Sequence, residues 1–473
     1  MSWRGKGHEA GAKIMKKFLK ALALGLAVLL VACLQPLDRT PYLATSYHEE
    51  TLRRWEQSAA ARFSTNGPVR AGWAKVKLTP TLGVDDDPES GRFRMVPLAG
   101  YGARKGRPAT GVAHDVWAKA LAVEVRGQRV VWVALDALIV PWEVADAACR
   151  ALAQAPGLRR EQVYLGATHT HSSLGGWGEG PVPEMFAGPF QPGIRTWMTR
   201  CVVEAARSAV SNLAPATVAT GGFEAPEWVR NRLVGSAGRT DGHMGLLAVR
   251  RADGATAVLG AFGAHATLLG SDNMQFDRDY PGAWSDVVEQ ATGGLALFMA
   301  GAVGSQSAQP GGAATSGERV GRVGRALGEQ TLQALGRMTF RETARLGAAG
   351  VELTLPSLHL RLTEGLRVRP WLSRHVVPVR PTTFMQAVHV GDATWLSMPC
   401  DFSGELSAPL REEGLARGRH VAVTSFNGDY VGYVIPGKYY HLGGYEPRVM
   451  SFHGPTAGDY FEDWARRVGL GWE

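Results

Sequence analysis

A chain of 473 residues, 45% apolar and 20% charged, is long enough to bury a large core and too apolar for widespread disorder. Its formal net charge of +8 would favour anionic membrane surfaces or acidic ligands, but Lys and Arg are scattered, without a basic run or aromatic-basic interleaving. These features argue against nucleic-acid binding, and nothing in them implies a protein partner.

The amino-terminal stretch has the order of a bacterial export signal. A lysine-rich segment (residues 16–20) precedes an apolar run (residues 21–31), which ends in small residues just before Cys33. The run is shorter than the roughly 20 apolar residues that a membrane-spanning helix needs. We expect a lipoprotein signal peptide over residues 1–33, with lipidated Cys33 holding the mature chain to a membrane of the bacterial cell envelope, facing the periplasm or the exterior. An ordinary secretory signal with an incidental cysteine is the alternative, and Met15 is a candidate for the true start.

Three cysteines follow this region: Cys149, Cys201 and Cys400. Their number is odd and their spacing lacks a C-x-x-C pair. We therefore expect buried thiols rather than a disulfide framework or a thiolate metal site.

The rest of the chain predicts a tether followed by one domain. Residues 34–68 are polar and mixed, with a possible helix at 49–62, and are interpreted as the tether. Apolar runs and helical periodicities then alternate over 69–473. Strands are expected at 72–78, 121–125, 130–135, 162–167, 217–221, 244–250, 257–262, 295–299, 384–390 and 421–426. Helices are expected at 144–153, 194–212, 283–291, 318–335, 403–414 and 457–467, and the segment 305–316, rich in small residues, is expected to be a loop. This alternation predicts a single large α/β domain with mixed β-sheets in the centre and α-helices around them.

The sharpest local feature is a histidine pair, His169 and His171, in the run Thr168 to Ser173 directly after the apolar run 163–167. On a strand, positions two apart share a face, so both imidazoles would point the same way at the strand's carboxyl end. Two neutral imidazoles can hold zinc, or one can hold it while the other moves protons. One buried, hydrogen-bonded histidine beside one surface histidine would give the same pattern.

Three later residues stand at comparable places. His265 follows the apolar strand expected at 257–262, where open-sheet sites gather. Asp401 lies between a strand end and a helix start, and Tyr433 closes the run Asn427 to Tyr433. Taken alone, Asp401 could be a helix N-cap and Tyr433 a core residue.

Several blocks in a fixed order make the chain resemble the neutral and alkaline (non-lysosomal) ceramidase family across roughly residues 71–455. Each block is a loose pattern by itself, and their order makes the set specific. The blocks are Ala71 to Pro80, Leu98 to Gly102, Ala167 to Ser172, Asn231-Arg232, Asp279 to Gly282 and Tyr445-Glu446.

The resemblance implies a Zn²⁺-dependent hydrolase of a linear amide. The family's zinc-ligand positions correspond to His169, His265, Asp401 and Tyr433. The positions that contact the substrate amide or move protons correspond to His171, Arg232 and Tyr445, and the active-centre serine to Ser307. Two imidazoles, a carboxylate and a phenol oxygen can hold zinc and leave a place for water, whose pKa the metal lowers to about 7. A guanidinium and a tyrosine hydroxyl suit the developing oxyanion, and an imidazole suits protonation of the leaving nitrogen.

The sequence also departs from the family. Asp401 stands where the family has Glu, and Gly304 to Gln309 (GSQSAQ) replaces G-D-V-S-P-N, which keeps Ser307 but not its neighbours. Lys77 stands where the family usually has Asp. We also expect no β-sandwich domain of the kind that follows in full-length members.

These observations favour a zinc hydrolase that cleaves the N-acyl amide bond of ceramide or a related N-acyl lipid, a substrate that a membrane-anchored enzyme would meet. The altered block around Ser307 favours a second interpretation, a metal-dependent hydrolase of another amide or ester. A third is a non-catalytic envelope binding lipoprotein, against which the intact histidine block and Tyr433 count.

Overall fold

One large mixed β-sheet forms the centre of the fold. The computed structural model describes residues 5–312, 315–377 and 379–472. Twelve strands are joined in the order β14-β12-β11-β9-β2-β16-β18-β19-β21, with β6, β7 and β8 branching from β2. Their bounds are β2 Phe63–Lys77, β6 Trp117–Val125, β7 Gln128–Leu135, β8 Val163–Ala167, β9 Ala214–Glu224, β11 His243–Arg251, β12 Thr256–Phe262, β14 Gly293–Ala300, β16 Thr343–Thr354, β18 Thr382–Val390, β19 Ala393–Ser397 and β21 His420–Thr424. Short two-stranded pairs add β1 Leu34–Pro36 with β17 Leu366–Val368, β3 Thr81–Leu82 with β4 Arg92–Phe93, β5 Gly111–Val112 with β13 Gln275–Phe276, β10 Val229–Asn231 with β15 Gln306–Ala308, and β20 Asp401–Phe402 with β22 Tyr433–Val434.

The 15-residue strand β2 connects two packed layers of strands. Its first half, up to Pro68, pairs with β16, and its second half, from Val69, pairs with β6. Apolar side chains of all twelve strands share one buried cluster, which includes Trp132, Leu297 and Trp395. Because such strands are covered on both faces, their sequences are almost continuously apolar rather than alternating.

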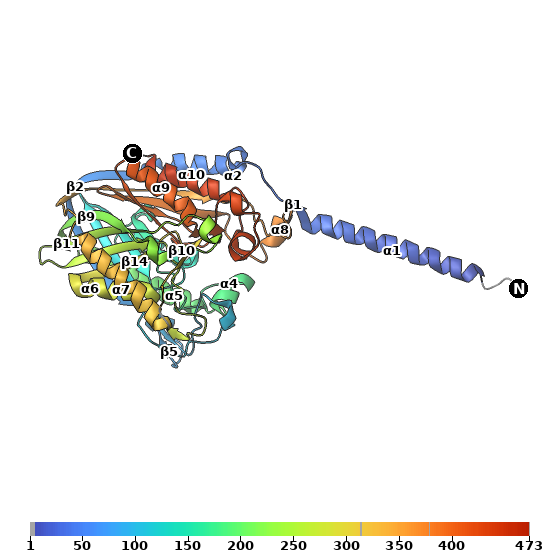
Figure 1. The fold of residues 1–473 in the computed structure, drawn as a ribbon, viewed down its shortest axis with the longest axis horizontal. Helices are drawn as coiled ribbons and strands as arrows, with labels where there is room; N and C mark the ends of the chain where they lie inside the picture. The colour runs from blue at the N-terminus through green and yellow to red at the C-terminus, as the bar shows by residue number, and fades with distance from the viewer. Residues whose placement is uncertain (1–4, 313–314, 378, 473) are drawn as a thin grey trace.

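Helices cover the outer faces of these layers. Helices α3 and α5 pack on β6–β8, and α6 and α7 pack on β11, β12 and β14. Helices α2, α9 and α10 cover the β16–β21 region, and Figure 1 shows them together along one side of the molecule. The helix bounds are α1 Gly5–Cys33, α2 Ser46–Gln57, α3 Trp142–Gln154, α4 Pro181–Ala187, α5 Pro192–Ser211, α6 Asp279–Thr292, α7 Ser316–Leu335, α8 Pro370–Ser373, α9 Gly404–Ala416 and α10 Ala457–Leu470.

The predicted α/β class is confirmed, and every strand and helix expected after residue 69 has a counterpart. Strands β16 and β19 were not predicted from the sequence. The sequence of β16, TARLGAAGVELT, is rich in Ala and Gly, which have low strand propensity. It is held as a strand by its two neighbours, β2 and β18.

The predicted tether is corrected over its second part. Strand β2 begins at Phe63, so the sheet already includes residues 63–68. Helix α2 packs on the domain, because Thr51 Oγ1 is 2.7 Å from the Tyr460 hydroxyl and accepts a 2.9 Å hydrogen bond from Thr354 N. Polar composition suggested a tether, but Tyr47, Leu52 and Trp55 of α2 pack against the buried cluster that includes residues of β16 and α10.

Helix α1 projects from the body of the molecule and ends at Cys33 (Figure 1). Among the described residues, no helix combines the length and apolar character needed to cross a bilayer. Cys149, Cys201 and Cys400 are buried free thiols, as predicted.

Candidate metal centre

Short connections at strand ends bring the predicted site residues together. The run that carries His169 and His171 follows β8, and His265 follows β12. Strands β20 and β22 place Asp401 directly beside Tyr433 in parallel register. The site therefore lies where several strands end, which is the usual position in α/β folds.

Three imidazoles converge at this point. One ring nitrogen from each of His169, His171 and His265 lies within 4.8 Å of the others, a grouping that could hold a metal ion. The Nε2 atoms of His169 and His171 are 3.2 Å apart, and the ring centroids of His169 and His265 are 4.7 Å apart. The predicted convergence of His169 and His265 is therefore present.

The prediction that His169 and His171 share a strand face is wrong, because strand β8 ends at Ala167. His169 instead adopts φ of +61°, a left-handed backbone conformation that is uncommon for residues other than glycine. Its ring stacks on Phe426 with centroids 3.9 Å apart, and this contact fixes its orientation.

Hydrogen bonds to backbone carbonyls set the tautomers of two imidazoles. His169 Nδ1 lies 2.7 Å from Leu138 O, and His265 Nδ1 lies 2.9 Å from Val303 O and 3.0 Å from Gln306 O. A carbonyl only accepts, so each Nδ1 carries the proton and each Nε2 keeps its lone pair. Metal-binding histidines are commonly oriented in this way.

Asp401 and Tyr433 complete the group on the side of His265. Asp401 Oδ1 is 3.4 Å and the Tyr433 hydroxyl 3.3 Å from His265 Nε2. Asp401 is 1% exposed, its Oδ2 accepts a 2.9 Å hydrogen bond from the Tyr430 hydroxyl, and its Oδ1 has no hydrogen-bond partner. A buried carboxylate oxygen without a partner is costly. The N-cap of α9 is Ser403, so the helix-cap alternative for Asp401 does not hold.

Burial controls the ionisation of these groups. It lowers the pKa of His169 to about 3 and lowers those of His171 and His265 well below the ordinary value, with nearby imidazoles and Arg232 adding to the effect. Burial raises the pKa of Asp401 to about 7, against the opposing effect of Arg232. The imidazoles are therefore neutral, the form that ligates a metal.

Arg232 links the centre to the rim. Its guanidinium donates a 2.8 Å hydrogen bond to the Tyr433 hydroxyl and lies 2.9 Å from Glu446 Oε1. Tyr445 packs edge-on to Tyr433 at 5.7 Å between ring centroids and is 42% exposed. These contacts place Arg232 and Tyr445 at the mouth of the site.

Ser307 lies beside the centre in backbone pairing. It forms a parallel bridge with His265 and pairs with Arg230 across β10 and β15. The expected loop at 305–316 is thus partly a strand, because β15 covers residues 306–308. Ser307 does not belong to the side chains that line the cavity described next.

A cavity of about 110 Å³ leads to the imidazoles and is lined mainly by apolar and aromatic side chains. His169, His171 and Asp401 lie at its inner end. The apolar lining includes Leu138, Ile139, Trp177, Val182, Phe186, Val377, Val379 and Met450, with Tyr430, Tyr433 and Tyr445 among them. A ligand with an apolar chain would fit the apolar lining, and a polar bond at the end of that chain would lie beside His169, His171 and Asp401.

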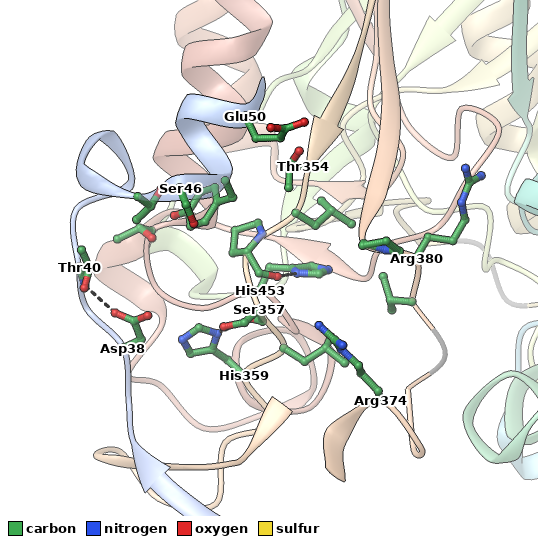
Figure 2. Close-up of a pocket in the computed structure, with 18 of the residues that line it drawn as sticks. Asp38, Thr40, Ser46, Glu50, Thr354, Ser357, His359, Arg374, Arg380 and His453 are labelled. Atoms are coloured by element: carbon green, nitrogen blue, oxygen red, sulfur yellow. Dashed lines mark hydrogen bonds between the residues drawn. The ribbon is translucent and has the colours of Figure 1, made fainter. Parts of the chain in front are cut away.

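A larger cavity of about 780 Å³ lies between the amino-terminal segment and the end of β16. Figure 2 shows that mainly polar side chains surround it, including Asp38, His359, Arg374 and His453. It contains none of the predicted site residues. We assign the chemistry to the smaller cavity because the imidazoles and the unpartnered carboxylate oxygen are there.

Sequence reasoning gave no role to several residues that shape the centre. Tyr430 holds Asp401, Glu446 holds Arg232, and Arg104 donates a 2.5 Å hydrogen bond to His171 O. Gly100, at φ of +111°, lets the His171 ring approach, since a Cβ there would lie 2.5 Å from it. Gly100 and Glu446 stand inside recognised blocks, and Tyr430 stands in the run Asn427 to Tyr433, so these positions were the available signal.

Comparison with known proteins indicates which protein family the chain is similar to. Residues 81–309 match the family model described as neutral/alkaline non-lysosomal ceramidase, N-terminal. The matched range contains His169, His171, Arg232, His265 and Ser307. A search of curated proteins finds no match.

Two solved structures share the fold. A neutral ceramidase from Pseudomonas aeruginosa is 21% identical, with a TM-score of 0.70, and the match covers 85% of this chain and 74% of that one. A structure described as a ceramidase complexed with C2 is 19% identical, with a TM-score of 0.71 and the same coverages. At these identities the likeness establishes the fold.

The family match supports an amidohydrolase. Over residues 81–309, the chain is similar to the neutral/alkaline non-lysosomal ceramidase family.

Proposed function

We propose that this protein hydrolyses the N-acyl amide bond of ceramide or a related N-acyl lipid, using a zinc ion held at the imidazole cluster. The observation that carries the proposal is the meeting of three neutral imidazoles with an unpartnered buried carboxylate oxygen at the inner end of an apolar cavity. An apolar cavity suits an acyl chain, and the polar inner end suits the amide.

The residues present fit zinc. His169 and His265 direct Nε2 lone pairs inward, and Asp401 Oδ1 lacks any other partner. Together with the Tyr433 hydroxyl they supply N and O donors of the kind zinc prefers. When bound, zinc supplies Lewis-acid chemistry and lowers the pKa of a water molecule to about 7.

The other side chains have distinct tasks in this proposal. Arg232 holds the Tyr433 hydroxyl and carries positive charge near the position where negative charge develops on the amide oxygen. His171 is neutral and has a ring nitrogen 3.2 Å from His169, so it is placed to take a proton from the attacking water and pass it to the leaving nitrogen. Tyr445 positions the substrate at the cavity mouth. The chain would act at the bacterial cell envelope, held by a lipid on Cys33.

A second candidate is hydrolysis of a smaller amide or an ester. The cavity of about 110 Å³ is well below the roughly 300–1,000 Å³ that is usual for ligand pockets. The altered block around Ser307 also favours this candidate.

The test compares metal content and hydrolysis of a fluorogenic N-acyl lipid in the purified protein and in matched variants. We expect about one zinc per chain, and loss of both zinc and activity in His169→Ala. Ser307→Ala should keep zinc, and His420→Ala, a histidine at the start of β21, should keep zinc and activity. Full activity in His169→Ala would refute the proposed centre, whereas activity only on short amides or esters would favour the second candidate.

A further inference from the structure

Exposed apolar side chains gather around the mouth of the metal-centre cavity. We call them the apolar rim. They come from the β17 hairpin, from α8 and the residues after it, and from the π-helix η9 (Tyr445–Met450). The apolar rim consists of Leu362, Leu366, Trp371, Val376, Tyr445 and Val449, each between 38% and 56% exposed.

Hydrogen bonds join the β17 hairpin to η9. Arg448 of η9 donates a 2.5 Å hydrogen bond to Leu362 O, and Leu362 N donates to Leu366 O at 2.9 Å. Val377, next to the exposed Val376, lines the cavity together with Tyr445. The rim therefore borders the opening through which a substrate would enter.

The predicted lipid attachment point lies in the same surface. Strand β1 begins directly after Cys33 and pairs with β17. Arg369 N donates a 2.8 Å hydrogen bond to Cys33 O, and Trp371 Nε1 donates to Ala32 O at 3.4 Å. In Figure 1, α8 lies against the start of β1, at the end of the molecule from which α1 projects. A lipid on Cys33 would therefore emerge beside the rim.

The charge of this surface is positive. Arg374 and Arg448 are exposed and Arg369 is half-buried, whereas Glu364 is the exposed acidic residue of the same hairpin. Glu446 of η9 is paired with Arg232. Arginines around exposed aromatic and aliphatic side chains are typical of surfaces that bind anionic lipid headgroups.

From these observations we propose that the apolar rim docks on the surface of an anionic lipid bilayer, with the cavity mouth opening toward the lipid. Trp371, Val376 and Val449 enter the interfacial region, and the arginines contact phosphate groups. The entry of a substrate from the membrane rests on the function proposed above. The docking of the rim on a bilayer is independent of that function.

Docking can be measured through Trp371, the one tryptophan among the described residues that is mostly exposed. The full chain is reconstituted in vesicles of phosphatidylglycerol and phosphatidylethanolamine, with and without brominated acyl chains. Bromine quenches tryptophan only at close approach. We expect quenching that disappears in Trp371→Phe, and absence of this difference would mean that the rim faces away from the bilayer.

Two further variants keep the amino terminus unchanged, so that attachment is equal in all samples. Leu366→Asp combined with Val449→Asp should reduce the quenching of Trp371 to the unbrominated level. Leu415→Asp, which adds the same charge at an exposed leucine of α9 outside the rim, should not. Near-ultraviolet circular dichroism confirms that each variant is folded. Loss of a concentration-dependent dimer with unchanged quenching would instead make the rim an interface between two copies.

Activity gives an independent measurement. The double variant should hydrolyse an N-acyl lipid embedded in vesicles at least about ten-fold more slowly, with little change on a water-soluble short-chain amide. If the unchanged protein hydrolysed neither substrate, the proposed function would be contradicted. The quenching experiment would still test whether the rim docks on the bilayer. Equal loss on both substrates would contradict entry from the membrane.

Discussion

Gln306 explains how the altered block of residues 304–309 keeps its shape. Its side-chain amide donates hydrogen bonds to Gly263 O, Ala302 O and Asp241 O, and its Oε1 accepts one from Asp241 N. Its backbone carbonyl accepts a hydrogen bond from His265 Nδ1. The residue therefore ties the loop after β14 to the loop that carries His265.

We predict that Gln306→Ala lowers the free energy of unfolding by about 2–4 kcal/mol, because several buried polar groups lose their partner. It should also weaken metal retention, since the position of His265 depends on this loop. Urea unfolding and metal analysis after dialysis measure the two effects. Unchanged metal retention in a destabilised variant would mean that His265 is positioned independently of Gln306.

Asp401 allows a test that separates charge from size. Asp401→Asn keeps the shape of the side chain and removes its charge, so we expect roughly 10–100-fold weaker zinc binding, measured by competition with a chelator. Asp401→Glu keeps the charge and has the residue usual in the family, so it should retain zinc. Equal zinc binding in Asp401→Asn would show that the carboxylate is not a ligand.

At the scale of elements, α2 shows how a polar segment becomes part of the domain. Thr51 is fully buried and its hydroxyl contacts the Tyr460 hydroxyl while accepting from Thr354 N. One side chain thus joins α2 to α10 and to the end of β16.

Thr51→Val should therefore cost about 1–3 kcal/mol of unfolding free energy, because it leaves Thr354 N without its acceptor in a buried place. Ser58→Ala, at the end of the same helix, removes a hydrogen bond to Trp55 O and a 3.3 Å one from Arg62, both partly exposed, and should cost less than about 0.5 kcal/mol. Urea denaturation monitored by fluorescence measures both. If the two variants were equally stable, α2 would be a detached segment, as the sequence first suggested.

At the scale of the whole molecule, burial of neutral histidines should make stability depend on pH. His453 is 4% exposed, its Nδ1 donates to Pro356 O, and burial lowers its pKa to about 4. The unfolded chain takes up this proton near pH 6.5 and the folded chain only near pH 4. Acid in this interval therefore favours the unfolded state.

His453→Met removes this group at similar size and supplies the comparison. The stability advantage of the wild type over His453→Met should fall by up to about 1.4 kcal/mol per pH unit as the pH decreases from about 6.5 toward 4. Urea unfolding at a series of pH values measures it. A difference that does not change with pH would show that His453 is protonated in the folded chain.

Periodicity and local patterns in the sequence were sufficient for the α/β class and for most elements. They failed for β16, whose Ala- and Gly-rich sequence is a strand only because neighbours lie on both sides, and for the boundary near residue 63. Both depend on pairing between segments hundreds of residues apart, since residues 63–68 of β2 pair with residues 343–348 of β16. For the centre, the recognised blocks selected residues that the fold brings together, although the strand-face explanation for His169 was wrong.

By itself, the amino-acid sequence determined which donor groups were available: imidazoles, a carboxylate and a phenol, each placed where a strand ends. Side-chain chemistry and hydrophobic periodicity are local properties, so they can be read from the chain alone. Only the tertiary structure decided that these groups meet and that Asp401 Oδ1 lacks another partner. Those features depend on packing and backbone hydrogen bonds between distant segments, which no local pattern specifies.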